Sequence, residues 1–133
     1  MLLSGRRIFL VEDNPENIAV IQILLKNQGA ELIVDAYASG QVQRVMAAMP
    51  LDLIILDLML PFGRSGFDVF DELHRTPLLH DVPVVLVTAA DAGQTLYEAQ
   101  QRGFNGFIAK PIDTGLFPQQ IAHIIQGGSV WHD

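Results

Sequence analysis

The 133-residue sequence contains no cysteine and no long hydrophobic run. The absence of cysteine excludes disulfides, thiolate metal sites and cysteine nucleophiles. No stretch approaches the roughly 18 apolar residues that a membrane-spanning helix needs. Arg6 and Arg7 follow a start of only a few residues, which is unlike a secretory signal peptide. We therefore expect a cytoplasmic protein with no membrane partner.

Basic residues are also few, with 8 Lys and Arg against 15 Asp and Glu and a net charge of −7. Arg44, Arg64, Arg75 and Arg102 are scattered along the chain and form neither a run nor a stripe. A nucleic-acid interface requires clustered positive charge. Direct binding of nucleic acid by this chain is therefore not expected.

Five short apolar runs alternate with segments of helical periodicity. The runs 8–11, 32–34, 53–56, 83–87 and 106–109 are short enough for strands, and 8–11 has the unalternated apolar sequence of a central strand covered on both faces. Helices are expected from Pro15 up to Gly29, over 42–49, around 67–73, over 91–102 and over 117–125. Such alternation predicts an α/β fold, a doubly wound five-stranded parallel sheet with helices on both faces. We expect one domain over residues 1–133, with a core of about 7–127 and a short C-terminal tail, 128–133.

Polar residues stand directly after the predicted strands. Glu12 and Asp13 follow the first strand, Asp57 the third, Thr88 ends the fourth, and Lys110 follows the fifth. The carboxyl ends of parallel strands share one edge of a sheet, where ligands bind. The fold therefore predicts that three carboxylates, a hydroxyl and an ammonium gather in one crevice.

This set of groups favours phosphoryl chemistry. Carboxylate oxygens without histidine or cysteine favour a hard cation such as Mg²⁺, which also offsets the repulsion among the carboxylates. A carboxylate such as Asp57 is able to attack phosphorus and form an aspartyl phosphate. Lys110 and Thr88 would then bind the remaining phosphoryl oxygens.

Four segments together resemble the receiver domain of two-component response regulators. They are residues 9–14 (FLVEDN), 53–61 (LIILDLMLP), 85–89 (VLVTA) and 107–112 (FIAKPI). Each is weak alone, but their order and spacing along about Arg7 to Gly127 are typical of that family. The resemblance implies the flavodoxin-like receiver topology, with strand order 2-1-3-4-5.

The resemblance also implies roles for individual residues. Asp57 would be the phosphoacceptor, assisted by Lys110 and Thr88. Glu12, Asp13, Asp57 and the backbone carbonyl of Met59 would bind Mg²⁺ or Mn²⁺.

A second group of residues would report the phosphorylation. By the same resemblance, Thr88 moves toward the phosphoryl group and Phe107 turns inward. The surface of the fourth helix, fifth strand and fifth helix then changes. The Lys110–Pro111 peptide bond is expected to be cis.

The resemblance implies a phosphorylation-dependent signalling switch, not an enzyme that turns over an external substrate. The domain would phosphorylate itself from its donor and dephosphorylate itself slowly. The donor would be a phosphohistidine on a sensor histidine kinase or histidine phosphotransfer protein, and an effector protein would read the result. A phosphorylation-dependent homodimer is compatible with this interpretation.

Other interpretations use the same residues. A pseudo-receiver that binds partners without phosphorylation should lack part of the acidic set. An aspartate-based phosphohydrolase generally has a second carboxylate where this chain has Met59, and a flavin-binding protein needs a hydroxyl- and glycine-rich loop after the first strand. Phe107 also fits as an ordinary core residue, and Thr88 as a satisfied hydroxyl at a strand end.

Two segments depart from the family pattern. The loop from Pro61 to Gly66 is one residue longer than usual, so its shape beside the site is not fixed by the resemblance. The helix over 91–102 has few large apolar residues, so we expect it to pack softly.

Overall fold

A computed structural model describes residues 1–39 and 41–132. These residues form a parallel sheet of six strands in the order β2-β1-β3-β4-β5-β6. The strands are β1 (Arg7–Val11), β2 (Glu31–Asp35), β3 (Leu53–Leu56), β4 (Val84–Thr88), β5 (Gly106–Ala109) and β6 (Val130–His132). The helices are α1 (Pro15–Lys26), α2 (Val42–Ala47), α3 (Gly66–Arg75), α4 (Ala92–Arg102) and α5 (Phe117–Ile125).

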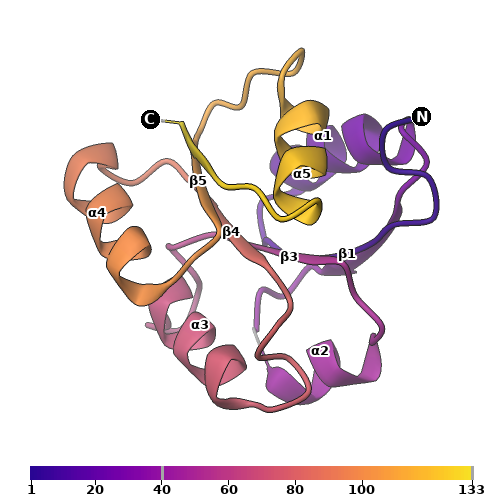
Figure 1. Ribbon diagram of the computed structural model, residues 1–133. Helices are drawn as coiled ribbons and strands as arrows, with labels where there is room; N and C mark the ends of the chain where they lie inside the picture. Colours follow the sequence, from indigo (N-terminus) through magenta and orange to yellow (C-terminus); the bar gives the residue numbers. More distant parts are fainter. Residues whose placement is uncertain (40, 133) are drawn as a thin grey trace.

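The helices cover both faces of the sheet, as the α/β prediction required. Figure 1 shows α1 and α5 on one side, and α2, α3 and α4 on the other. Among the described residues the apolar core divides accordingly. One cluster joins the sheet to Ile21 of α1 and Phe117 of α5, and the other joins it to Val45 of α2, Phe70 of α3 and Ala99 of α4. The three central strands β1, β3 and β4 are almost completely buried, which explains their uninterrupted apolar sequence.

The C-terminal segment differs from the prediction. The sequence predicts five strands and a short tail, but Val130–His132 forms a sixth strand parallel to β5. Asp133, the last residue of the predicted tail, lies outside the described residues. Three residues after a Gly-Gly pair have no recognisable strand period, because β6 is stabilised by pairing with β5 and not by its local sequence.

Local signals at the helix ends explain where most helices begin. The Asn14 side chain accepts the Asn17 N–H and caps α1, with Pro15 as its first residue. Ser65 and Asp68 form a reciprocal capping box at the start of α3. The helix α4 begins at the Asp91 cap and ends at Gly103, whose φ is 103°.

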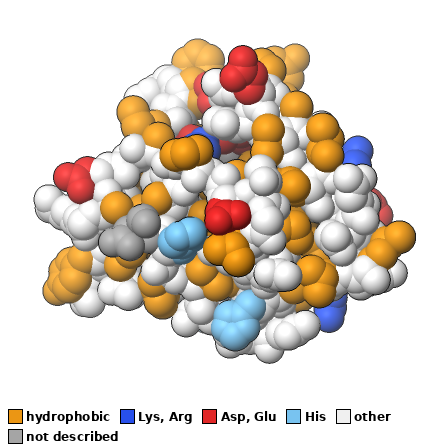
Figure 2. All heavy atoms as spheres, turned by 90° about the horizontal axis from the view of Figure 1, so that it is seen from above, with side chains coloured by type: hydrophobic (Ala, Val, Ile, Leu, Met, Phe, Trp, Pro, Cys, Tyr) orange, Lys and Arg blue, Asp and Glu red, His pale blue; other side chains and the backbone are white. Residues whose placement is uncertain are grey.

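Two further observations concern the surface. Among residues 1–39 and 41–132, no helix is long and apolar enough to cross a bilayer. Figure 2 shows the face above α1 and α5, where Lys and Arg side chains form small separate patches. A continuous basic surface is not present on the face shown there.

Candidate functional site

The polar residues predicted to share a crevice follow the carboxyl ends of four strands. Glu12 follows β1, Asp57 follows β3, Thr88 ends β4, and Lys110 follows β5. Backbone bonds tie these ends together. The Asp57 N–H donates to the Val11 carbonyl at 3.4 Å, and the Lys110 N–H donates to the Thr88 carbonyl at 2.9 Å. The backbone pairing of the sheet thus sets the distances between the strand ends that carry these side chains.

Lys110 joins two of the carboxylates directly. Its Nζ donates to Glu12 Oε1 at 2.7 Å and to Asp57 Oδ2 at 2.9 Å. The exposed fractions of these side chains are 14% for Lys110, 3% for Glu12 and 12% for Asp57. In such a poorly hydrated place, the two anions and the cation depend on one another.

The electrostatic balance shows in the pKa of Lys110. Burial of the ammonium alone would lower this pKa. Hydrogen bonds to Glu12 and Asp57, together with their negative charge, outweigh burial and raise the pKa above its ordinary value. Lys110 is therefore a firmly charged cation at neutral pH and remains a hydrogen-bond donor.

Glu12 is held in place by the backbone as well as by Lys110. Its Oε2 accepts the N–H groups of Asp13 and Asn14, both at 3.1 Å. Both carboxylate oxygens of Glu12 are thus engaged inside the protein. By contrast, Asp13 is exposed, and within the described chain its carboxylate makes no hydrogen bond.

The donor set fits a magnesium ion held by few protein ligands. In the described part of the chain, no group of three or more His, Cys, Asp or Glu side chains is arranged to hold a metal ion. Both carboxylate oxygens of Glu12 already accept hydrogen bonds within the protein, and its role as a metal ligand stays a prediction. Mg²⁺ usually keeps several waters and takes one or two carboxylates, and Asp13 and Asp57 supply two.

The loop after Asp57 shapes the approach to its carboxylate. The Met59 N–H donates to Asp57 Oδ1 at 3.3 Å, and Met59 pairs with Ser65 across the loop. Phe62 and Gly63 adopt positive φ angles of 61° and 72°, and Phe62 is 93% exposed. This left-handed pair forms the turn that the Arg64 N–H closes by donating to the Pro61 carbonyl at 3.3 Å.

Sequence reasoning missed the role of Gly66. A Cβ atom on Gly66 would lie 2.3 Å from the Asp57 carbonyl oxygen, so only glycine fits there without movement of the backbone. The Gly66 N–H also donates to the Leu58 carbonyl at 2.8 Å. The sequence signal for this close approach was a glycine at the first position of a helix, directly after the N-cap residue Ser65.

Thr88 and Phe107 are both fully buried. The Thr88 hydroxyl accepts the Ala90 N–H at 3.3 Å, and no described hydrogen bond links it to Asp57 or Lys110. Phe107 belongs to the core cluster on the α4 side of the sheet. Their roles as a switch pair stay predictions. The Lys110–Pro111 peptide bond is cis, and so is Met49–Pro50.

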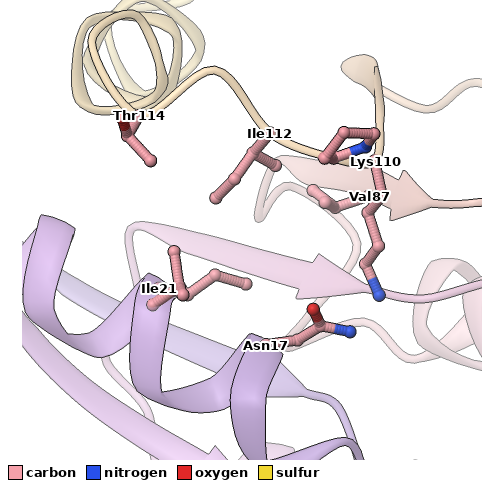
Figure 3. Close-up of a pocket in the computed structure, with 8 residues that line it drawn as sticks. Asn17, Ile21, Val87, Lys110, Ile112 and Thr114 are labelled. Carbon is pink, nitrogen blue, oxygen red and sulfur yellow. The ribbon is translucent and has the colours of Figure 1, made fainter.

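A cavity of about 210 Å³ lies beside Lys110, between α1 and the segment that follows β5. Figure 3 shows the Lys110 side chain extending toward the end of α1 that carries Asn17. Ile21, Val87 and Ile112 give the cavity a mostly apolar wall. The ammonium group therefore lies between an apolar flank and the carboxylates.

Comparison with known proteins identifies the family. The sequence profile described as "Response regulator receiver domain" matches residues 8–122. The chain belongs to this family. The receiver domain is a signalling domain of two-component systems, and its fold is the predicted flavodoxin-like one with one additional strand.

Curated relatives support the assignment. This receiver domain is 35% identical over 108 residues to the response regulator PleD of Caulobacter vibrioides, covering 80% of this chain and 23% of PleD. It is 31% identical over 107 residues to the phosphate regulon transcriptional regulatory protein PhoB of Escherichia coli, covering 80% of this chain and 46% of PhoB. The chain thus spans less than half the length of either relative.

Solved structures show the same fold. A putative response regulator from Chloroflexus aurantiacus matches the receiver domain with a TM-score of 0.82 and 21% identity, covering 91% of this chain and 98% of that chain. The chemotaxis protein CheY4 of Vibrio cholerae matches with a TM-score of 0.78 and 18% identity, covering 90% and 98%. At these identities the likeness concerns the fold alone.

Proposed function

We propose that this receiver domain is a phosphorylation-dependent switch whose phosphoacceptor is Asp57. The observation that carries the proposal is the contact of Lys110 Nζ with Asp57 Oδ2 at the edge of the sheet. It places a cation against one oxygen of a carboxylate that remains partly accessible to solvent. Signalling is the general function of the family, and the assignment of Asp57 extends it to one residue of this chain.

The proposed reaction transfers a phosphoryl group from a phosphohistidine. An Asp57 carboxylate oxygen forms a bond to phosphorus, the nitrogen–phosphorus bond breaks, and the leaving imidazole takes up a proton. Lys110 donates hydrogen bonds to the phosphoryl oxygens, and Glu12 keeps the ammonium in position. Asp13 and Asp57, with the Met59 carbonyl and Glu12 as predicted from the sequence, would hold Mg²⁺, which would neutralise charge on the transferring group. The domain would lose the phosphoryl group again by slow hydrolysis.

Phosphorylation would be read at the surface of α4, β5 and α5. The Thr88 hydroxyl would move toward the phosphoryl group, and Phe107 would occupy its inward position. Two features support this part of the proposal. Thr88 and Asp57 lie at the same edge of the sheet, because Thr88 ends β4 and Asp57 follows β3. The helix α4 contributes one buried residue, Ala99, so few apolar contacts hold it against the sheet. A coupling of about 1–3 kcal/mol would change the affinity of a partner about 5- to 150-fold.

The proposed partners are a sensor histidine kinase or histidine phosphotransfer protein as donor and a downstream effector as reader, in the cytoplasm. Similarity to the sensor histidine kinase GacS of Pseudomonas protegens, 30% over 133 residues, agrees with a place in phosphorelay signalling. Dimerisation upon phosphorylation belongs to the same proposal.

Intact mass spectrometry after incubation with Mg²⁺ and acetyl phosphate tests the proposal. We expect the wild type to gain the mass of one phosphoryl group, labile in alkali, and the Asp57→Asn variant to gain none. Asp81→Asn, at an exposed position before β4, is the matched control and should label like the wild type. A wild type that stays unmodified with both acetyl phosphate and a phosphohistidine donor would refute the switch and favour the pseudo-receiver.

A further inference from the structure

The additional strand β6 lies on the surface where the proposed function expects a phosphorylation response. It pairs in parallel with β5, with Gly106 opposite Val130, Phe107 opposite Trp131 and Ile108 opposite His132. Figure 1 shows this last, yellow segment running alongside β5. The outer edge of β5 is therefore covered by the chain itself.

The face of β6 that is turned toward α5 is anchored at two residues. Val130 packs with the core cluster on the α5 side, and the Gln120 amide nitrogen lies 2.9 Å from His132 Nδ1. A Cβ atom on Gly106 would lie 2.9 Å from Ile124 Cδ1 of α5 and 3.0 Å from the Val130 carbonyl oxygen, so the glycine in β5 permits the close approach of both α5 and β6. β6 is therefore packed against both β5 and α5.

Trp131 connects β6 to Phe107. Registered neighbours on parallel strands point to the same face of a sheet, and Trp131 packs against the cluster that contains Phe107 and Phe104. Phe107 is 0% exposed. An outward turn of the Phe107 ring, toward the edge of β5, would bring it into the place that Trp131 occupies.

We propose that β6 is a clamp that holds Phe107 in its inward position, so that the docking of β6 and the phosphorylation of Asp57 favour each other. This inference rests on the proposed function, in which the inward position of Phe107 belongs to the phosphorylated state. Coupling between two sites is reciprocal. Phosphorylation therefore tightens β6 on β5, and a loosened β6 makes Asp57 harder to phosphorylate.

Trp131 is the single tryptophan of the chain, so its fluorescence reports on β6 alone. Acrylamide quenching is measured before and after phosphorylation by acetyl phosphate and Mg²⁺, with the adduct quantified by intact mass in the same sample. We expect a lower quenching constant in the phosphorylated protein and no change in Asp57→Asn. An unchanged or higher quenching constant in a sample that carries the adduct overturns the clamp and leaves the proposed function intact. Absence of the adduct overturns both.

Substitutions at position 131 test the reverse direction. Trp131→Ala should lower the equilibrium constant for phosphoryl transfer from a phosphohistidine donor to Asp57 about 5-fold or more, whereas Trp131→Phe, which keeps an aromatic ring beside Phe107, should stay within about twofold of the wild type. Leu78→Ala, at an exposed site away from β6, is the control for general loss of apolar surface. Thermal melts establish that each variant is folded. Equal equilibrium constants for Trp131→Ala and the wild type overturn the clamp.

Discussion

At the scale of single residues, Lys110 lies within 2.9 Å of carboxylate oxygens from two different strand ends. Removing one partner of a buried ionic group leaves uncompensated charge, which typically costs about 3–5 kcal/mol. We expect Lys110→Met to destabilise the protein by about this amount in urea denaturation. It should also abolish labelling of Asp57.

A second substitution separates charge from packing in that result. Without Lys110, the carboxylates of Glu12 and Asp57 lack their shared cation. Glu12→Gln combined with Lys110→Met removes one of these two negative charges, so part of the lost free energy of unfolding should return. Lys26→Met, in the exposed last turn of α1, should change the free energy of unfolding by no more than about 0.5 kcal/mol. A double variant less stable than Lys110→Met would mean that the two carboxylates do not repel each other as described.

Gly66 offers a second test at this scale. The added Cβ of Gly66→Ala would meet the Asp57 carbonyl oxygen, so the backbone that carries Asp57 must shift. We expect a loss of about 1–3 kcal/mol, as for other overpacked sites, together with slower labelling by acetyl phosphate. Gly93→Ala is the control, because its Cβ would meet nothing closer than 3.7 Å. Wild-type labelling by Gly66→Ala would contradict the importance of this close approach.

At the scale of elements, α4 depends on a polar connection to α3. Arg102 pairs with Asp71 of α3 at 2.7 Å and with Glu98 at 2.8 Å, and its guanidinium lies 4.6 Å from the centre of the Phe67 ring. Burial alone would lower the pKa of Arg102, but the bonds to Glu98 and Asp71 raise it above its ordinary value, so the cation is permanent.

Loosening this connection should free α4 locally. We expect Arg102→Gln to increase amide hydrogen exchange throughout α4, while global stability falls by no more than about 1 kcal/mol, because exposed ion pairs contribute little. Arg75→Gln, at the exposed end of α3, should leave the exchange of α4 unchanged. Equal exchange in the Arg102 variant and the wild type would show that apolar contacts alone hold α4.

The same scale shows how far the sequence determines the fold. The first five strands and the helices were predictable because apolar runs, apolar periodicity and caps such as Asn14 are local signals. The strand β6 was not, since its stability comes from β5, some twenty residues earlier in the chain. At the site, the fold prediction indicated which residues meet, but the engagement of Glu12 by two backbone N–H groups depends on the turn after β1, which sequence pattern does not specify.

At the scale of the whole molecule, the net charge of −7 and the acidic sheet edge favour binding of a cation. A ligand that binds the folded state stabilises it, by about 2.7 kcal/mol at 100 times Kd. We expect Mg²⁺ to raise the Tm of the wild type and to raise that of Asp13→Asn much less, as followed by circular dichroism. Glu16→Gln, which removes a neighbouring exposed charge on α1, should keep the full increase. An equal increase in all three proteins would show that the ion acts on net charge and not through Asp13.

The bond between Lys110 and Glu12 joins positions 98 residues apart, and two strands, β3 and β4, separate β1 from β5 in the sheet. Chains are synthesised from the N-terminus and fold while they emerge. A nascent chain made only as far as β4 already contains Asp57 but has no Lys110 to accompany it. The contacts of Lys110 with Glu12 and Asp57 therefore form only after β5 has been synthesised. Under the proposed function, an incomplete chain has the acceptor carboxylate but not the lysine that would assist its phosphorylation.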